Sequence, residues 1–277
     1  MTRAHGVDLS RWDVSFDPAK ATGKIDFAIM KASEGNFRDS KFMEIWAGVK
    51  KLPIRGAYHY LRSGLGWQVQ ADFFLSVVKG LDFHLYAMDF EGTGNTMGAA
   101  FADTAHRWMD YVARKTGRMV ILYSNPSHYD ADLHPYGDWM KDYPLWIAHY
   151  FYNPSPDKNP SLPRFRKPGD WSIYQYASER NFPGHAREYG TPVTSIDLNV
   201  FNGTVDEMRH WLKLDQVVAP VTQPVTPVPP ATPTTPPSTP PASTGDASKA
   251  AQIELLEWMI EQLTTKKNEI SGGGPVG

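Results

Sequence analysis

The sequence contains no cysteine, no long apolar run and no excess of basic charge. Without cysteine, neither a disulfide framework nor a zinc site built on thiolates is possible. Since no run of about 18 apolar residues is present, we expect no transmembrane segment. The 28 basic and 30 acidic side chains give a net charge of −2. This balance argues against a nucleic-acid partner, because nucleic-acid-binding proteins usually carry a basic excess.

Proline and the aromatic residues are unevenly distributed along the chain. Residues 219–244 hold 10 of the 23 prolines and 7 threonines, whereas residues 1–218 hold 34 of the 35 aromatic residues. A Pro/Thr-rich segment without charge or aromatic residues cannot bury a core. We therefore predict a folded domain at 1–215, a linker at 216–246, a helix at 247–271 and a flexible tail at 272–277.

The predicted helix after the linker has a heptad pattern. Its apolar seam alternates spacings of three and four residues and includes one lysine, Lys267; the other members are Ile253, Leu256, Ile260, Leu263 and Ile270. Such a seam is typical of helices that associate, and two and a half heptads are marginal in isolation. We predict a homo-oligomer or docking to a larger assembly through residues 247–271. The alternative is an amphipathic helix that folds back on the domain.

Short apolar runs alternate with helical patterns through the first domain. The runs predict eight strands, at 4–9, 25–31, 54–60, 83–90, 119–124, 145–150, 171–176 and 194–200. Helical periodicity predicts helices at 41–51, 67–79, 99–115 and 204–214, and Asp17-Pro18 is typical of the start of a short first helix.

This alternation predicts an α/β fold with a mostly parallel sheet. Eight strands favour a (β/α)8-type barrel, and the alternative is an open doubly wound sheet. The segment 153–160, with three prolines and two asparagines, is too irregular for a helix. We therefore expect an incomplete ring of helices around the barrel.

Four acidic residues lie at or near the ends of predicted strands, where parallel barrels place their functional groups: Asp8, Asp89, Glu91 and Asp197. Asp89 and Glu91 are two residues apart on a strand, so their side chains share a face, with Cα atoms about 6.7 Å apart. Carboxylates this close repel each other, and the pKa of one should rise so that it can donate a proton while the other stays ionised. Glycoside hydrolysis needs this division of roles. The alternative is an N-capping Asp beside a solvated Glu.

Seven motifs, in order and at matching spacing, resemble the family 25 glycoside hydrolases, the Chalaropsis-type lysozymes found among phage endolysins and bacterial autolysins. They are Gly6-Val-Asp-Leu-Ser10, Lys31-Ala-Ser-Glu-Gly35, Gly56-Ala-Tyr-His-Tyr60, Asp89-Phe-Glu91, Trp146-Ile-Ala-His-Tyr150, Gln175-Tyr176 and Ile196-Asp-Leu-Asn199. The resemblance covers about residues 4–212. It implies an irregular, flattened barrel and N-acetylmuramidase activity, which cleaves the β-1,4 bond between N-acetylmuramic acid and N-acetylglucosamine in peptidoglycan.

The resemblance also implies roles for particular residues. Glu91 matches the general acid. Asp89 matches the partner carboxylate, which either orients the 2-acetamido group of the substrate as an internal nucleophile or acts more directly. Asp8 and Asp197 match acids that flank this pair. The positions expected to contact the sugar are Tyr60, Tyr123, Trp146, Tyr150 and Gln175. Retention and inversion of configuration both stay open.

Histidine and basic residues have simpler interpretations. His59 and His149 come near predicted strand ends, but no His-x-x-x-His pattern accompanies them. We therefore expect no metal and no cofactor, and we assign these histidines to hydrogen bonds in the core or groove. A basic loop contains Arg164, Arg166 and Lys167. It is interpreted as solvated surface, with binding of an anionic cell-wall polymer as the alternative.

Two functions from different classes follow. The first is a peptidoglycan-degrading muramidase of a phage-lysin type. The second is a catalytically silent glycan-binding module tethered through its C-terminal helix. Residues 1–8 lack the apolar segment of a secretory signal. We therefore expect synthesis in the host cytoplasm and action on the bacterial wall after release, or within a virion or secreted assembly.

Overall fold

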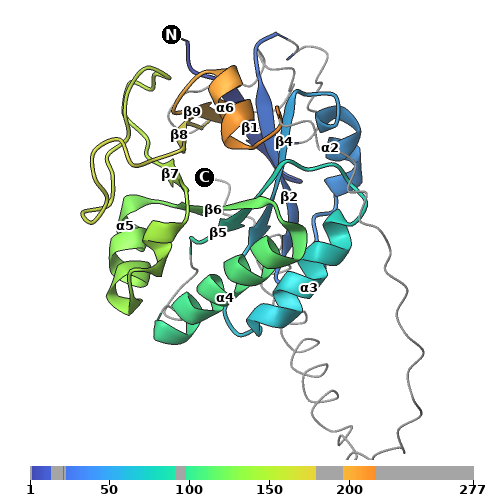
Figure 1. Cartoon of the computed structure of the whole chain (residues 1–277), viewed down its shortest axis with the longest axis vertical. Coiled ribbons are helices and arrows are strands. Elements are labelled where there is room, and N and C mark those ends of the chain that lie inside the picture. The colour runs from blue at the N-terminus through green and yellow to red at the C-terminus, as the bar shows by residue number, and fades with distance from the viewer. Residues whose placement is uncertain (1, 14–20, 22, 92–97, 179–195, 216–277) are drawn as a thin grey trace, which may run out of the picture. The chain divides into compact units, whose positions relative to one another are not determined.

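A computed structural model of the chain describes residues 2–13, 21, 23–91, 98–178 and 196–215 (Figure 1). The predicted linker, heptad helix and tail, and the helix predicted at Asp17-Pro18, lie outside the described residues. Among the described helices, none combines the length and the apolar character that a membrane span requires.

The sheet closes into a barrel of eight strands. The neighbour order is β1-β9-β8-β7-β6-β5-β4-β2, and β1 also pairs with β2, so the open doubly wound alternative is wrong. The short β3 adds an antiparallel hairpin to β2 that the sequence pattern did not predict. The strands are β1 (His5–Leu9), β2 (Phe27–Glu34), β3 (Phe37–Arg38), β4 (Ile54–Tyr60), β5 (Leu85–Asp89), β6 (Met119–Ser124), β7 (Leu145–Ala148), β8 (Ile173–Ala177) and β9 (Asp197–Phe201).

One barrel strand runs against the others. All neighbouring pairs in the barrel are parallel, except that β9 is antiparallel to both β1 and β8. Asp197 therefore begins its strand, yet it lies opposite Asp8 near the end of β1. Asp197 reaches the predicted end of the barrel because its strand is reversed, and not because it ends a parallel strand.

Four of the described helices match the predicted positions: α2 (Phe42–Val49), α3 (Trp67–Val78), α4 (Ala99–Thr116) and α6 (Val205–Trp211). The short α5 (Pro126–His128) was not predicted. The apolar face of α4 is buried, and Gly117 ends this helix in the left-handed conformation at φ 63°. Thr204 and Glu207 form the capping box predicted for α6.

The ring of helices is incomplete, as predicted. Short helical turns fill most of the interval between β6 and β7, and residues 149–172, between β7 and β8, contain no helix. Elsewhere on the barrel, α3 and α4 lie side by side against the sheet (Figure 1).

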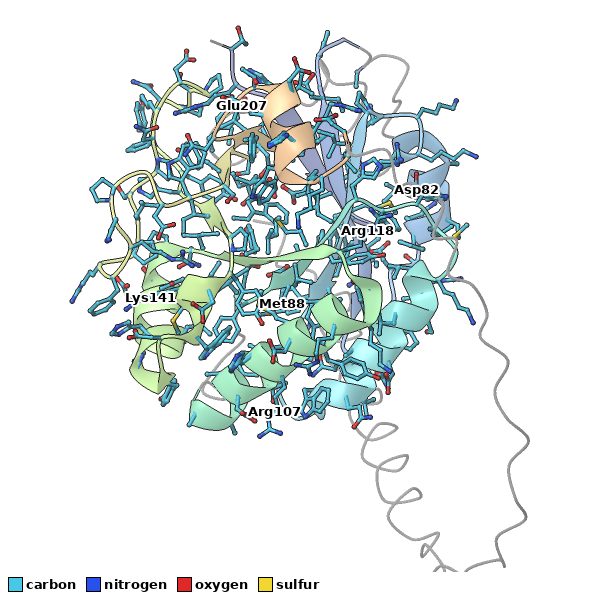
Figure 2. The ribbon with its side chains drawn as sticks, in the orientation of Figure 1. Asp82, Met88, Arg107, Arg118, Lys141 and Glu207 are labelled. Atoms are coloured by element: carbon cyan, nitrogen blue, oxygen red, sulfur yellow. The ribbon has the colours of Figure 1, made fainter. Side chains whose placement is uncertain are left out.

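Alternation along the strands produces two apolar clusters. One side of each strand packs on the helices: Met88 lies there, fully buried with Trp108 of α4. In Figure 2, Arg107 projects from α4 away from the barrel. The other side fills the barrel interior, where Phe27, Ile29, Leu85 and Ile121 join Met208 and Leu212 from α6 and its C-cap.

A glycine makes room for this interior. A Cβ on Gly6 would lie 2.3 Å from the ring of Phe27, which is far inside contact distance. The glycine of the Gly-Val-Asp-Leu-Ser motif thus lets an aromatic ring fill the barrel beside β1. The next residue on the same side of β1 is Asp8, where the interior becomes polar.

Candidate active site

The two-residue alternation of the strands carries interior side chains up to one open end of the barrel. On β5, Asp89 follows Leu85 and Ala87 on the interior side. On β6, Tyr123 follows Ile121 in the same way. Polar side chains from different strands therefore converge at this end above an apolar floor.

Gln175 stands at the centre of this polar end and is only 1% exposed. Its Oε1 accepts hydrogen bonds from the hydroxyls of Tyr123, at 2.7 Å, and Tyr150, at 2.5 Å. Its Nε2 donates to Asp8 Oδ2, at 2.8 Å, and to Asp197 Oδ2, at 3.2 Å. A reversed amide would set its oxygen against two carboxyl oxygens, so these bonds also decide the amide orientation. One side chain thus joins four other predicted site residues.

Asn199 extends this network and had no predicted role of its own. Its Nδ2 donates to Asp8 Oδ2 at 2.7 Å, and its Oδ1 accepts from Trp146 Nε1 at 2.8 Å. Asn199 lies two residues after Asp197 on β9, and the alternation of strand side chains was the signal that could have identified it. Trp146, a predicted sugar contact, is thereby held by the acid cluster.

The backbone that carries Asp89 and Glu91 is held between β5 and β6. The Phe90 amide donates to the Tyr123 carbonyl at 2.9 Å, and Ser124 Oγ donates to the Phe90 carbonyl at 2.9 Å. The Tyr123 hydroxyl lies 3.4 Å from Glu91 Oε1. Asp89 is buried, and within the described part of the chain its Oδ1 has no hydrogen-bond partner.

All four acids have raised pKa values. Burial raises the pKa of Glu91. Burial and then the charge of Glu91 raise the pKa of Asp89 well above its usual range. Burial raises the pKa of Asp8 to about 7, and burial followed by Asp8 raises that of Asp197. The sequence predicts a raised pKa at one member of the Asp89–Glu91 pair. The pKa is raised at all four acids because the whole cluster, and not one carboxyl, is withdrawn from water.

Lys31 supplies a buried cation beside these acids. A shift in the β2–β4 register between Lys31 and Ser33 sets Lys31 opposite Tyr58 and Glu34 opposite Tyr60. Lys31 follows Phe27 and Ile29 on the interior side, and the irregularity turns Glu34 to the same side, where Lys31 Nζ is 2.5 Å from Glu34 Oε2. Burial raises the pKa of Asp89, and the positive charge of Lys31 opposes this effect by lowering it.

Tyr60, the predicted sugar contact on β4, lies between two cations. Lys31 Nζ and the Arg62 guanidinium carbon are each 4.9 Å from the centre of its ring. Arg62 also pairs with Glu34. The sequence pattern included Lys31 and Glu34 in a motif without indicating this arrangement, because it depends on the register shift in β2.

Comparison with known proteins identifies the family. The model of the glycosyl hydrolases family 25 matches residues 7–185. The chain belongs to glycosyl hydrolase family 25. The protein YegX of Escherichia coli O6:H1 is 30% identical over 214 residues, which are 74% of this chain and 72% of YegX. Lysozyme M1 of Streptomyces globisporus is 27% identical over 72% of this chain and 68% of its own length.

Solved structures agree with this family assignment. A family 25 glycosyl hydrolase from Bacillus anthracis superimposes with a TM-score of 0.62 and 25% identity, over 75% of this chain and 92% of that one. The chain is therefore a glycoside hydrolase, and the polar end of its barrel is the candidate active site.

The two histidines of this family 25 hydrolase have different surroundings. His59 is fully buried in the core: it lies 2.8 Å from Ser33 Oγ and 3.2 Å from Gln70 Oε1. Its ring stacks on Trp108 at 5.1 Å, and burial lowers its pKa to about 3. His149 accepts a hydrogen bond from the Ser161 amide at 3.3 Å, at the wall of a groove. Both therefore serve hydrogen bonding.

The groove begins at Glu91. A cavity of about 490 Å³ lies between Glu91, the segment Asn125–Ser127, and His149 with Tyr150. Glu91 and Tyr150 are thus the members of the hydrogen-bonded cluster that face this space. An extended substrate in the groove would meet Glu91 directly.

Proposed function

We propose that this family 25 hydrolase is an N-acetylmuramidase, which cleaves the β-1,4 bond between N-acetylmuramic acid and N-acetylglucosamine in peptidoglycan. The observation that carries the proposal is a cluster of buried carboxyl groups with raised pKa values whose member Glu91 opens on a groove. Lysozyme M1, a relative over most of the chain, supports the same substrate class.

Glu91 is the proposed general acid. Burial keeps its carboxyl protonated at higher pH than usual, and a protonated carboxyl can donate to the leaving glycosidic oxygen. Asp89 is the proposed partner. On this proposal its carboxyl accepts a hydrogen bond from the amide of the 2-acetamido group.

We propose that the remaining predicted residues shape the acid cluster or contact the sugar. Asp8 and Asp197 both accept a hydrogen bond from the amide of Gln175 and so hold this central side chain in place. The proposed sugar contacts are Tyr60, Tyr123, Trp146, Tyr150 and Gln175.

The decisive experiment uses Glu91→Gln, which keeps the shape of the side chain and removes the acid. We expect it to abolish lysis of purified peptidoglycan and to leave the thermal unfolding midpoint near that of the wild type. Glu44→Gln, at an exposed position of α2, is the matched control and should be fully active. Mass spectrometry of wild-type digests should find new reducing ends at N-acetylmuramic acid. Reducing N-acetylglucosamine or an active Glu91→Gln would refute the proposal.

The proposal extends to a lysin made in the host cytoplasm that acts on the wall after release. It predicts that the purified protein degrades walls added from outside. It also predicts that the same protein, expressed in the cytoplasm of that host without a route across the membrane, leaves the cells intact. Lysis of the cells by cytoplasmic expression alone would contradict this part.

We also propose that residues 247–271 associate, either with a second copy or with a larger assembly, through the heptad seam. The linker at 216–246 would then give the barrel reach over a polymeric substrate. Light scattering should give a larger particle for the full chain than for a 1–215 truncation, beyond the difference in chain mass. Monomers in both cases would exclude self-association.

A further inference from the structure

A second cavity adjoins the one at Glu91. The first cavity includes Pro126 and Ser127 in its wall, and so does a second one of about 440 Å³. The second cavity ends at Asp130, Ala131 and Arg164. The two cavities therefore adjoin at α5, and Arg164 lines the one that Glu91 does not.

The wall that carries Arg164 is tied to the barrel. The Arg164 amide donates to both oxygens of Asp130, at 3.0 and 3.2 Å. Three residues earlier, the Ser161 amide donates to His149 Nδ1 at 3.3 Å. The loop between β7 and β8 thus has two fixed points along the groove, and Arg164 stands at a defined place.

The side chain of Arg164 is available to bind an anion. It is 85% exposed, and its Nε lies 3.8 Å from Asp130 Oδ2, which is a long ion pair. That contact is the one ion pair of its guanidinium within the described part of the chain, so most of its N–H donors face the cavity or solvent. A guanidinium with a free edge suits a carboxylate, which it can bind through two parallel hydrogen bonds.

The same loop contains two basic residues with other surroundings. Arg166 is buried, and its guanidinium is occupied by Tyr129, the carbonyls of Met140 and Tyr143, and Asp170. Lys167 is exposed and does not line either cavity. The basic loop noted in the sequence therefore divides into a structural residue, a surface residue and Arg164.

We propose that Arg164 binds a carboxylate of the peptide stem carried by the N-acetylmuramic acid units of the chain being cleaved, an inference that rests on the proposed function. The second cavity shares Pro126 and Ser127 with the one at Glu91, so a short branch attached to the bound sugar chain is a suitable occupant. Arg164 is then a specificity residue for stem-bearing substrate.

The test compares two substrates: glycan chains with their peptide stems, and the same chains after an amidase has removed the stems. The quantity is the ratio of kcat/KM on stem-bearing chains to kcat/KM on stem-free chains. For Arg164→Ala we expect this ratio to fall about tenfold, the effect of losing one charge-assisted contact at a partly solvated site. Lys167→Ala, the matched control, should keep the wild-type ratio.

Each of the other outcomes would contradict the inference, and each indicates a different cause. A wild-type ratio for Arg164→Ala shows that no stem carboxylate is bound there. An equal loss on both substrates indicates a sugar contact or a folding defect, and an equal loss in Lys167→Ala indicates unspecific charge attraction. If the Arg164→Ala defect appears only on walls that keep their anionic polymer, the ligand is that polymer.

The substrates also separate this inference from the proposed function. Cleavage of stem-free chains by the wild type, with reducing N-acetylmuramic acid ends, tests the muramidase alone. If the wild type cleaves neither substrate, the proposed function fails and this inference fails with it. If it cleaves both, an unchanged ratio in Arg164→Ala overturns only the role of Arg164.

Discussion

Gln175 and Asp8 are 167 positions apart in the chain, yet Gln175 Nε2 donates to Asp8 Oδ2 at 2.8 Å. Gln175 lies on β8 and Asp8 on β1, and the reversed strand β9 lies between them in the sheet. The contact exists because β9 pairs with both β1 and β8 and brings the two strands close together. It couples the acids on one side of the opening to the tyrosines on the other.

The first prediction concerns Gln175→Leu, which keeps the approximate volume of the side chain and removes its four hydrogen bonds. Two carboxyl groups and two hydroxyls would lose a buried partner. We expect the free energy of unfolding to fall by about 2–4 kcal/mol, and activity on peptidoglycan to fall at least about 100-fold. Urea unfolding and a lysis assay measure these effects. Gln68→Leu, at an exposed position of α3, is the control, and a Gln175→Leu variant indistinguishable from it would contradict the prediction.

The second prediction concerns the pH dependence of stability at Asp8. Burial raises its pKa from 3.8 to about 7. Between about pH 4 and pH 7 the folded protein holds a proton that the unfolded chain has released, so Asp8 makes the folded state less stable as the pH rises. Asp8→Asn removes this titration and keeps an oxygen for Gln175 and Asn199. From about pH 5 to pH 7 the variant should therefore gain stability relative to the wild type, on the order of 2 kcal/mol.

The free energy of unfolding must be compared as the difference between Asp8→Asn and the wild type at each pH. Burial lowers the pKa of His59 to about 3, and this buried neutral histidine makes both proteins less stable as the pH falls below about 6.5. The change of stability with pH that His59 causes is opposite in sign to the change that Asp8 causes. Since His59 is present in both proteins, its effect cancels in the difference. Urea unfolding of both proteins at several pH values is the measurement. A difference that stays constant with pH would contradict a raised pKa at Asp8.

The third prediction concerns Tyr123→Phe and the pH profile of activity. The Tyr123 hydroxyl lies 3.4 Å from Glu91 Oε1 and lowers the pKa of Glu91, against the effect of burial. Without this hydroxyl the pKa of Glu91 should rise. If Glu91 is the general acid, the alkaline limb of the kcat/KM profile then moves to higher pH. Tyr150→Phe, which removes a hydroxyl that donates to Gln175, should leave the limb in place. A shift of the Tyr123→Phe limb to lower pH would exclude this role for Glu91.

The fourth prediction separates Arg166 from its neighbour Lys167. Arg166→Ala removes a buried guanidinium that ties the loop before β8 to the short helical turns after β6. We expect the free energy of unfolding to fall by about 3–5 kcal/mol, whereas Lys167→Ala should change it by less than about 0.5 kcal/mol. Urea unfolding at neutral pH compares the two. Equal, small effects would mean that the loop is not a structural part of the barrel.

Strand and helix positions were predictable because they depend on local periodicity. The helix predicted at 67–79 is α3 (Trp67–Val78), and the strand predicted at 119–124 is β6 (Met119–Ser124). The two-residue spacing of Asp89 and Glu91 was equally visible. The direction of β9 was not, because alternating apolar and polar residues look the same in a strand read either way.

Contacts that depend on sheet irregularities were also missed. The turn of Glu34 towards Lys31 follows from a register shift in β2, which a sequence pattern does not indicate. The three basic residues of the 164–167 loop look alike in the sequence. Their different roles depend on which of them the fold buries.

The sequence alone determined the alternating elements, the acids near strand ends and the resemblance to a hydrolase family, because each is a property of residue types at short spacing. Only the tertiary structure decided that the sheet closes and which groups meet. The reversed strand β9, which pairs with both β1 and β8, brings Asp8, Gln175 and Asp197 into one hydrogen-bonded cluster. The fold also withdraws these groups from water, and this burial raises the pKa values of the acids.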